Sequence, residues 1–281
     1  MEQKKVVTIQ DISCFGKCSL TVALPVISAM GLSCAVIPTA VLSTHTGGFT
    51  GFTFHSLTDD IPKIADHWER EGIAFDGIST GYLGDERQIE IVSDFIGRFG
   101  RGKLVFVDPA MADAGVLYKG FDMDFVKSMR TLCERADVTV PNITEAALLT
   151  GTEYREEGYG EDYILDLLHK LVGMGAGTAV ITGVCYDGKN EGAVAYDGVT
   201  GEITRYFTGR IPTRCHGTGD VFAAVLFGAL VLGYGMEKSL RMAVEFTVDS
   251  IRKTVGDETH WYGVKFEQAI PGLIDMLRDD G

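Results

Sequence analysis

The four residues Gly217 to Asp220, which read Gly-Thr-Gly-Asp, carry the residue types from which the chemistry of this chain can be argued. A long apolar run to Leu232 follows them, and it predicts a buried helix that begins here. The first turn of a helix offers unpaired backbone N–H groups and a partial positive charge, and both attract an anion. Glycine has no Cβ, so Gly217 and Gly219 would let this backbone approach a phosphate closely.

Asp220 lies at the edge of this predicted anion site, where the positive end of the helix should favour its ionised form. A carboxylate there can accept a proton from a hydroxyl group while the N–H groups hold a phosphoryl group in transfer. The same residues are equally compatible with a glycine turn and a helix-capping aspartate, which involve no chemistry. The remainder of the chain has to decide between these interpretations.

The composition is that of an ordinary globular protein. The 281 residues suffice for one large α/β domain, and 46% of them are hydrophobic and 23% charged. The net charge of -14 and the lack of a basic block argue against nucleic acid and anionic membranes as partners. No apolar run reaches the roughly 18 residues of a membrane span, and no signal peptide precedes the first predicted strand, so we expect a cytoplasmic protein.

The six cysteines predict neither a metal site nor a redox pair, because none of them forms a C-x-x-C pattern. Cys14 and Cys18 are four residues apart, but no nearby His or Cys pair completes a ligand set. We therefore expect reduced thiols that pack as small apolar groups.

Strand and helix patterns alternate along the chain. Buried strands are predicted at 6–10, 34–42, 76–83, 103–107, 138–140 and 178–182, and a strand pair at 191–207. Helices are predicted at 20–30, 59–71, 85–99, 122–133, 144–150, 161–172, 218–232, 238–255 and 266–278. This alternation implies right-handed crossovers and a mostly parallel sheet with helices on both faces, in a single domain that spans 1–281.

Two loops and two caps complete the prediction. Residues 11–17 are predicted to form a polar loop that leaves the first strand. Residues 43–52 hold three glycines and small hydroxyl residues between aromatics, which predicts a mobile flap over the site. Ser19 and Thr144 are predicted to cap the helices that follow them.

Ligands of such sheets bind outside the carboxyl ends of the strands. The polar residues that fall at these ends are Asp11, Tyr82, Asp108, Asn142 and Thr182. Their convergence favours a ligand site over a simple turn at Gly217. The chain has no G-x-x-x-x-G-K-[ST] and no complete G-x-G-x-x-G, so it is neither a P-loop enzyme nor a typical dinucleotide-binding protein.

An anion hole and an aspartate at the head of a late helix resemble the ribokinase superfamily, and further motifs resemble pyridoxal kinases in particular. These motifs occur in the family's order over most of residues 6–255: Gln10 and Gly16, His45-Thr46, Thr80-Gly81-Tyr82, Asp108-Pro109, Pro141-Asn142 with Glu145, and Gly217-Thr218-Gly219-Asp220. The resemblance implies a ribokinase-like fold and phosphorylation of the 5′-hydroxymethyl group of pyridoxal, pyridoxine or pyridoxamine. It also implies ATP with Mg²⁺, a monovalent cation such as K⁺, and a homodimer.

The resemblance also implies roles for individual residues. Asp220 would be the general base, and Gly217, Thr218 and Gly219 would form the anion hole. The vitamer would contact Asp11, Cys18, His45, Thr46 and Tyr82. ATP would contact Asp108, Asn142 and Thr182, and the metal would be held by Asp113 and Glu145, by the preference of hard cations for oxygen ligands.

Several of these matches have an interpretation without chemistry. Asp108 can simply end a strand, and Asn142 with Glu145 can be a helix-capping pair. His45 can be an exposed loop histidine, and Tyr82 a half-buried aromatic residue.

Two departures from the pyridoxal kinase pattern keep alternatives open. Asp11 stands where these kinases commonly have serine, and Cys18 stands where they often have valine. An ionised Asp11 only accepts hydrogen bonds, so it favours a ligand edge with a donor, such as the aminomethyl group of pyridoxamine or the exocyclic amine of hydroxymethylpyrimidine. A hydroxymethylpyrimidine or related small-alcohol kinase is therefore the alternative enzyme, although such kinases usually carry Cys where Asp220 stands. A vitamin-binding relative without turnover is the third possibility, against which the intact Asp220 argues.

Overall fold

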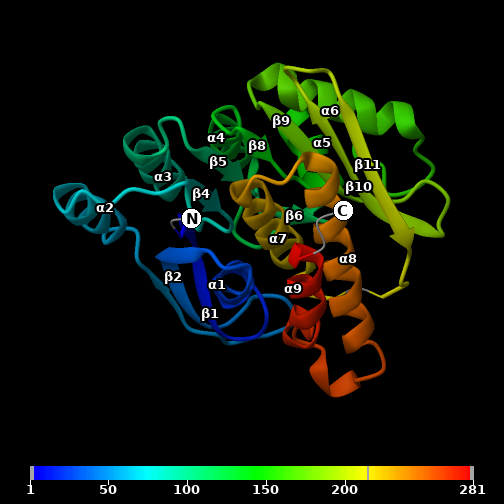
Figure 1. Cartoon of the computed structure of the whole chain (residues 1–281), viewed down its shortest axis with the longest axis horizontal. Coiled ribbons are helices and arrows are strands. Elements are labelled where there is room, and N and C mark those ends of the chain that lie inside the picture. Colours follow the sequence, from blue (N-terminus) through cyan, green and yellow to red (C-terminus); the bar gives the residue numbers. More distant parts are fainter. Residues whose placement is uncertain (1–2, 214, 279–281) are drawn as a thin grey trace. The chain divides into compact units, whose positions relative to one another are not determined.

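The computed structural model describes residues 3–213 and 215–278, which form two compact units. The first unit combines the chain up to Gly77 with the chain from Ile211 onward, and the second contains Ile78–Arg210 (Figure 1). In the described ranges, no helix is both long and apolar enough to cross a membrane.

The first unit pairs a small sheet with several helices. Its strands are β1 (Lys5–Phe15), β2 (Ser33–Thr44) and β3 (Phe54–Ser56), and its helices are α1 (Leu20–Ala29), α2 (Ile61–Arg70), α7 (Thr218–Leu232), α8 (Met236–Thr254) and α9 (Ile270–Arg278), with the short helices η1 (Glu258–His260) and η2 (Phe266–Gln268). Strands β1 and β2 are parallel, and β3 is antiparallel to β2. Helix α7 packs against both α1 and α8.

The second unit carries the longer run of neighbouring strands. Its strands are β4 (Gly77–Thr80), β5 (Leu104–Val107), β8 (Val138–Thr139), β9 (Thr178–Val184), β10 (Asn190–Asp197) and β11 (Ile203–Gly209), in the order β11-β10-β9-β8-β5-β4. Its helices are α3 (Glu86–Phe99), α4 (Met123–Cys133), α5 (Ile143–Thr150) and α6 (Glu161–Met174). The pairs β5–β8 and β8–β9 are parallel, whereas β9–β10 and β10–β11 are antiparallel. A separate antiparallel pair joins β6 (Ala112–Asp113) to β7 (Val116–Leu117).

Most predicted helices and strands are present within a few residues of their expected ends, because their apolar stripes are buried as the periodicity requires. Helix α3 is typical: Ile89, Val92 and Phe95 are each at most 2% exposed, and Asp85 caps the helix by accepting from Gln88 N–H. The short edge strand β3 was not predicted, and all three of its residues are exposed.

The prediction that a loop begins at Asp11 was wrong, because β1 continues to Phe15. The register with β2 shifts at this point: Gln10 pairs with Pro38 but Ile12 pairs with Val41, so Asp11 lies at a β-bulge. A bulge re-aims side chains, and here it allows two polar residues, Asp11 and Ser13, to be buried within a strand. Their polarity made the segment resemble a loop.

Both predicted caps were wrong in detail. Thr144 does not cap α5, because Asn142 is the N-cap and forms a full capping box with Glu145. Ser19 does occupy the N-cap position of α1, but its side chain makes no capping hydrogen bond.

Candidate active site

The start of α7 is fixed by close packing against the chain before α1. Gly217 has a φ of 78°, and a Cβ there would lie 1.8 Å from the carbonyl oxygen of Lys17. Gly219 differs, because a Cβ at that position would meet nothing within 4 Å. The backbone next to Gly219 is therefore open for a ligand to approach, whereas Gly217 is required by the fold itself.

Asp220 lies in the first turn of α7 with its carboxyl group partly buried. Burial raises its pKa to about 7, a hydrogen bond from the backbone of Ser19 opposes the rise, and the charge of Asp11 adds to it. The prediction that the helix start keeps Asp220 ionised was wrong, because the pKa is raised rather than lowered. Burying a carboxylate costs several kcal/mol, which exceeds the roughly 0.3–1 kcal/mol that a helix start contributes.

Asp11 is the second carboxyl group of this cluster, and it is 4% exposed. Burial raises its pKa, while hydrogen bonds from the hydroxyl groups of Ser19 and Ser13 favour its ionised form. The Ser13 Oγ–Asp11 Oδ2 distance is 3.1 Å. Asp11 is therefore buried and hydrogen-bonded within the protein rather than exposed to solvent.

The thiol of Cys18 lies beside both carboxyl groups. Burial raises its pKa well above the ordinary value, and the charges of Asp220 and Asp11 raise it further. A thiol in this environment stays protonated and is not a nucleophile at neutral pH. Cys18 can contribute a small apolar surface and a weak S–H donor to a ligand.

His45 connects the predicted flap to the C-terminal part of the first unit. Its Nε2 lies 2.9 Å from the carbonyl oxygen of Tyr262, and its Nδ1 accepts from Gly47 N–H at 3.1 Å. These partners fix the tautomer with hydrogen on Nε2. Burial lowers the pKa of His45, so the ring is neutral. The alternative of an exposed loop histidine is wrong, because the residue is 5% exposed.

Aromatic rings surround the flap. Phe49 lies 4.5 Å from Trp261 and 5.0 Å from His45, measured between ring centroids. A Cβ on Gly48 would lie 2.9 Å from the Trp261 ring, so this glycine permits the ring to pack on the flap backbone. Thr46, the other predicted vitamer contact in the flap, is exposed. The segment around Trp261 and Tyr262 was not singled out from the sequence, because nothing local links it to residues more than 200 positions earlier.

In the second unit, Glu145 joins the loop after β5 to the start of α5. Its Oε1 accepts from Met111 N–H at 2.9 Å and from Ala112 N–H at 3.3 Å, and its Oε2 accepts from Asn142 N–H at 2.9 Å. Asn142 in turn donates from Nδ2 to the carbonyl oxygen of Ala112 at 2.7 Å. The capping interpretation of Asn142 and Glu145 is thus confirmed.

Burial, with a smaller contribution from the charge of Asp113, raises the pKa of Glu145 to about 8. These two carboxyl groups were predicted to hold Mg²⁺. A cation beside them would relieve their repulsion, and Mg²⁺ commonly takes only one or two protein carboxylates, with water and phosphate oxygens as its other ligands. The donor set therefore fits Mg²⁺ bound together with a nucleotide. The described ranges contain no group of three or more acidic, His or Cys side chains that could hold a metal without such help.

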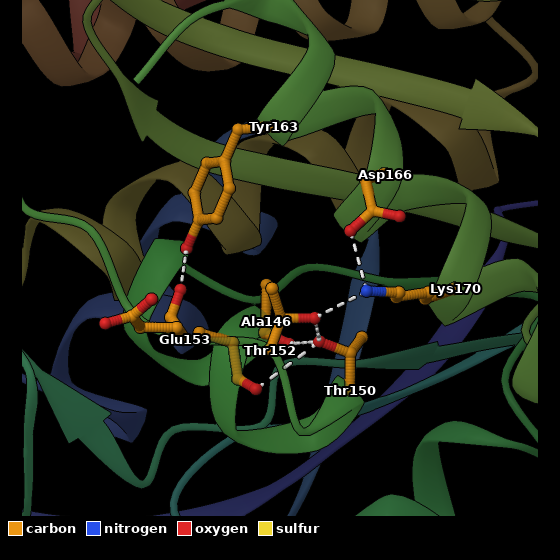
Figure 2. Close-up of polar contacts among 8 residues, drawn as sticks. Ala146, Thr150, Thr152, Glu153, Tyr163, Asp166 and Lys170 are labelled. Atoms are coloured by element: carbon orange, nitrogen blue, oxygen red, sulfur yellow. Dashed lines mark hydrogen bonds and ion pairs between the residues drawn. The ribbon is translucent and has the colours of Figure 1, made fainter. Parts of the chain in front are cut away.

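Figure 2 shows the polar contacts that hold the connection between α5 and α6. Lys170 Nζ lies 2.7 Å from Asp166 Oδ2 and donates to Thr152 Oγ1 at 3.0 Å, so α6 is joined to the residues after α5. Tyr163 donates its hydroxyl hydrogen to the carbonyl oxygen of Glu153 at 2.9 Å. These contacts join α6 to the residues that follow α5, the helix whose first turn contains Glu145.

The other predicted residues of the second unit lie at strand ends, as expected. Asp108 directly follows β5, and its N–H donates to the carbonyl oxygen of Thr80. Thr182, near the end of β9, forms an isolated parallel bridge with Asn142. Tyr82 is half-buried and stacks on Phe121 at a centroid distance of 5.5 Å, as the interpretation without chemistry proposed.

The chain is similar to one protein family and to several known proteins. The phosphomethylpyrimidine kinase family model matches residues 21–263. A protein of Bacteroides thetaiotaomicron, provisionally named a phosphomethylpyrimidine kinase and crystallised in a form with pyridoxal, is 37% identical, with 97% of this chain and 96% of that chain covered and a TM-score of 0.91. The structure of pyridoxal kinase from Lactobacillus plantarum is 31% identical, with 99% of each chain covered and a TM-score of 0.89. Pyridoxal kinase PdxY of Rubrobacter xylanophilus is 28% identical over 89% of this chain and 87% of its own length.

The fold and the relatives define an α/β phosphotransferase of the ribokinase-like class, with a mostly parallel sheet flanked by helices. Within that class, the chain belongs to the phosphomethylpyrimidine kinase family, whose model matches most of its length. The resemblance to pyridoxal kinases that the sequence motifs indicate is likewise confirmed.

Proposed function

We propose that this protein is an ATP-dependent kinase that phosphorylates the 5′-hydroxymethyl group of a B6 vitamer. The observation that carries the proposal is the environment of Asp220, a carboxyl group with a pKa of about 7 in the first turn of α7. A general base works best when its pKa lies near the operating pH. The relatives named pyridoxal kinases support the choice of vitamer class.

In this mechanism, Asp220 accepts the proton of the vitamer hydroxyl group as the oxygen attacks the γ-phosphorus of ATP. The bond between that phosphorus and the bridging oxygen breaks, so the products are the phosphorylated alcohol and ADP. The backbone N–H groups at Thr218 and Gly219 stabilise the charge on the phosphoryl oxygens. The accessible backbone at Gly219 supports this role.

The vitamer is proposed to contact the residues that the pyridoxal kinase resemblance indicates: Asp11, Cys18, His45, Thr46 and Tyr82. Both ring nitrogens of His45 are already hydrogen-bonded within the chain, so a contact with the vitamer would use a ring carbon edge. Asp11 has acceptor capacity left beside its two serine partners, because a carboxylate offers about four lone-pair positions. Asp11 would accept a hydrogen bond from a donor group on the ligand.

The nucleotide is proposed to contact Asp108, Asn142 and Thr182. Mg²⁺ would be held by Asp113 and Glu145 together with phosphate oxygens, and it would neutralise charge that develops on the phosphates. Because Glu145 already accepts three backbone hydrogen bonds, its contribution to a metal would be limited to its remaining lone pairs. Asp113, which is exposed, would be the more direct ligand.

A hydroxymethylpyrimidine kinase is the second candidate. The name of the matching family favours it, as does the buried carboxylate of Asp11, which suits the exocyclic amine of that substrate. Asp220 favours the vitamer instead, because hydroxymethylpyrimidine kinases usually carry cysteine at this position, whereas the resemblance associates aspartate with pyridoxal kinases. The two candidates differ in substrate only, since both transfer a phosphoryl group from ATP to a primary alcohol.

The test is steady-state kinetics of the purified protein with Mg-ATP on pyridoxal, pyridoxine, pyridoxamine and hydroxymethylpyrimidine. Phosphorylated product is identified by mass spectrometry, with ribose as a control alcohol. We expect at least one vitamer to have a kcat/KM at least about tenfold above that of hydroxymethylpyrimidine. A preference for hydroxymethylpyrimidine would select the second candidate, and no ATP-dependent product with any of the four would reject both in favour of a binding protein.

Three further proposals remain, of which the first two rest on the family resemblance and the third on the composition of the sequence. The protein is a homodimer, K⁺ increases its kcat, and it acts in the cytoplasm. Light scattering of the pure protein, replacement of K⁺ by tetramethylammonium in the assay, and fractionation of the source cells test them one by one.

A further inference from the structure

Ser19 holds a backbone conformation that is normally reserved for glycine. Its φ of 53° and ψ of -131° resemble the first central position of a type II′ turn, where a Cβ is disfavoured. Among the non-glycine residues at 3–213 and 215–278, only Ser19 and Ala114 have positive φ. Because glycine would fit here without strain, the presence of serine indicates a use for its side chain.

The hydroxyl group of Ser19 does not cap helix α1, although Ser19 occupies the N-cap position. Serine at an N-cap normally accepts a hydrogen bond from the first turn of its helix, but Ser19 makes no such bond to α1. The residue is 6% exposed, and its hydroxyl group instead donates to the carboxylate of Asp11. An isolated bridge between Ile12 and Ser19 places Ser19 beside the bulged part of β1.

The backbone of Ser19 reaches the other carboxylate of the cluster. Gly217 packs on the carbonyl oxygen of Lys17 and approaches the Cα of Cys18, so the first turn of α7 lies against the residues that lead into Ser19. The Ser19 N–H donates to the carboxylate of Asp220. One residue in a strained conformation therefore holds both carboxylates, Asp11 by its side chain and Asp220 by its backbone.

We propose that Ser19 is a positioning residue for phosphoryl transfer: it connects Asp11 to Asp220 and holds the Asp220 carboxylate in the orientation that accepts the substrate proton. This role rests on the proposed function, in which Asp220 is the base. Ser19 itself touches neither the alcohol nor the phosphoryl group in this scheme.

The experiment compares Ser19→Ala with Ser19→Gly, because both remove the hydroxyl group and only glycine removes the strain. We expect kcat to fall about tenfold in both variants, the usual size for loss of a charge-assisted hydrogen bond, with the KM for ATP within about twofold of wild type. We expect Ser19→Gly to unfold at a higher temperature than Ser19→Ala. If Ser19 had only a structural role, kcat would instead recover toward the wild-type value in the more stable glycine variant.

A double-mutant cycle with Asp11→Asn tests the connection itself. If the Ser19 hydroxyl acts through Asp11, then Ser19→Ala lowers kcat by less than about twofold in the Asp11→Asn background. Losses that multiply independently would overturn the proposal.

A third readout does not depend on turnover. Carboxyl ¹³C chemical shifts, with Asp11 assigned from Asp11→Asn, should show a higher pKa for Asp11 in both Ser19 variants, because a donor to its ionised form is lost. The titratable neighbours of this pair are Asp220 and the protonated Cys18 thiol, and both variants leave them in place. An unchanged Asp11 pKa would refute the proposal even if no vitamer is turned over, whereas an inactive wild type with a shifted Asp11 would refute only the proposed function.

Discussion

The imidazole ring of His45 occupies the space that a side chain on Gly16 would need. A Cβ at Gly16 would lie 2.2 Å from Cδ2 of His45, and Gly16 also has a φ of 107°. The ring cannot easily retreat, because Nε2 is bonded to the Tyr262 carbonyl group and Nδ1 to Gly47 N–H. The flap, the turn after β1 and the C-terminal segment therefore meet at one ring.

Gly16→Ala should displace the flap. We expect faster hydrogen exchange of residues 43–52 and a KM for the alcohol at least about tenfold higher, because the flap would no longer cover bound substrate. Gly31→Ala is the matched control: Gly31 has a φ of 88° but open space around its Cβ position, so this variant carries the backbone strain without the contact. Equal exchange of the flap in the two variants would show that the His45 contact does not hold it.

The glycines at the head of α7 should respond differently to alanine. Gly217→Ala should destabilise the fold by about 2 kcal/mol or more, because its Cβ would overlap the Lys17 carbonyl oxygen and its φ is positive. Gly219→Ala should fold with at least wild-type stability, since alanine is the better helix former and has room. It should nevertheless lose at least about tenfold in kcat/KM if a phosphate approaches this backbone. Thermal unfolding and kinetics of the two variants measure both effects, and full activity of Gly219→Ala would place the phosphate elsewhere.

Asp220 should give the enzyme a pH-dependent rate near neutrality. The base must be ionised, so kcat/KM should rise with pH and level off above an apparent pKa of about 7. Asp220→Asn should lower kcat by at least about 10²-fold at the plateau. A rate that falls across this range, or near-normal turnover by the Asn variant, would remove Asp220 from the role of base.

The same residue should lower stability at neutral pH. Its folded pKa of about 7 lies above the ordinary value of 3.8, so its contribution to stability is greatest below pH 3.8 and is lost as pH rises through 7. Asparagine cannot ionise. The Tm of Asp220→Asn relative to wild type should therefore increase between pH 5 and pH 8, where each 1 kcal/mol corresponds to roughly 2–4 °C. A constant difference in Tm would mean that the carboxyl pKa is not raised by folding.

Glu145 should matter for stability as well as for any metal. Glu145→Ala removes the acceptor of the N–H groups of Met111, Ala112 and Asn142, and we expect a loss of about 2–4 kcal/mol in the free energy of unfolding. Asp113→Asn is the comparison, because Asp113 is exposed and should change stability by less than about 0.5 kcal/mol while raising the Mg²⁺ concentration needed for half-maximal rate. Denaturant unfolding and Mg²⁺ titrations of the rate separate the two carboxylates. Equal stability losses would contradict this assignment.

Local patterns in the sequence were sufficient to predict most of the secondary structure. Apolar periodicity located α3, a long apolar run located α7, and turn residues located the β10–β11 pair, because helix and strand formation depends on neighbours a few positions away. The motif order from Gln10 to Asp220 likewise indicated the family that the comparisons confirm. The amino-acid sequence alone was therefore enough to identify the carboxyl group at the head of α7.

Only the tertiary structure decided how these groups behave. The sequence suggested an ionised Asp220, an open choice between metal ligand and helix cap for Glu145, and an ordinary helix cap for Ser19. Burial raised the pKa of Asp220, and three backbone N–H groups donate to the carboxylate of Glu145. The hydroxyl group of Ser19 donates to Asp11, which lies at the bulge of β1. Desolvation and hydrogen-bond partners depend on which distant segments pack together, and no local pattern encodes that.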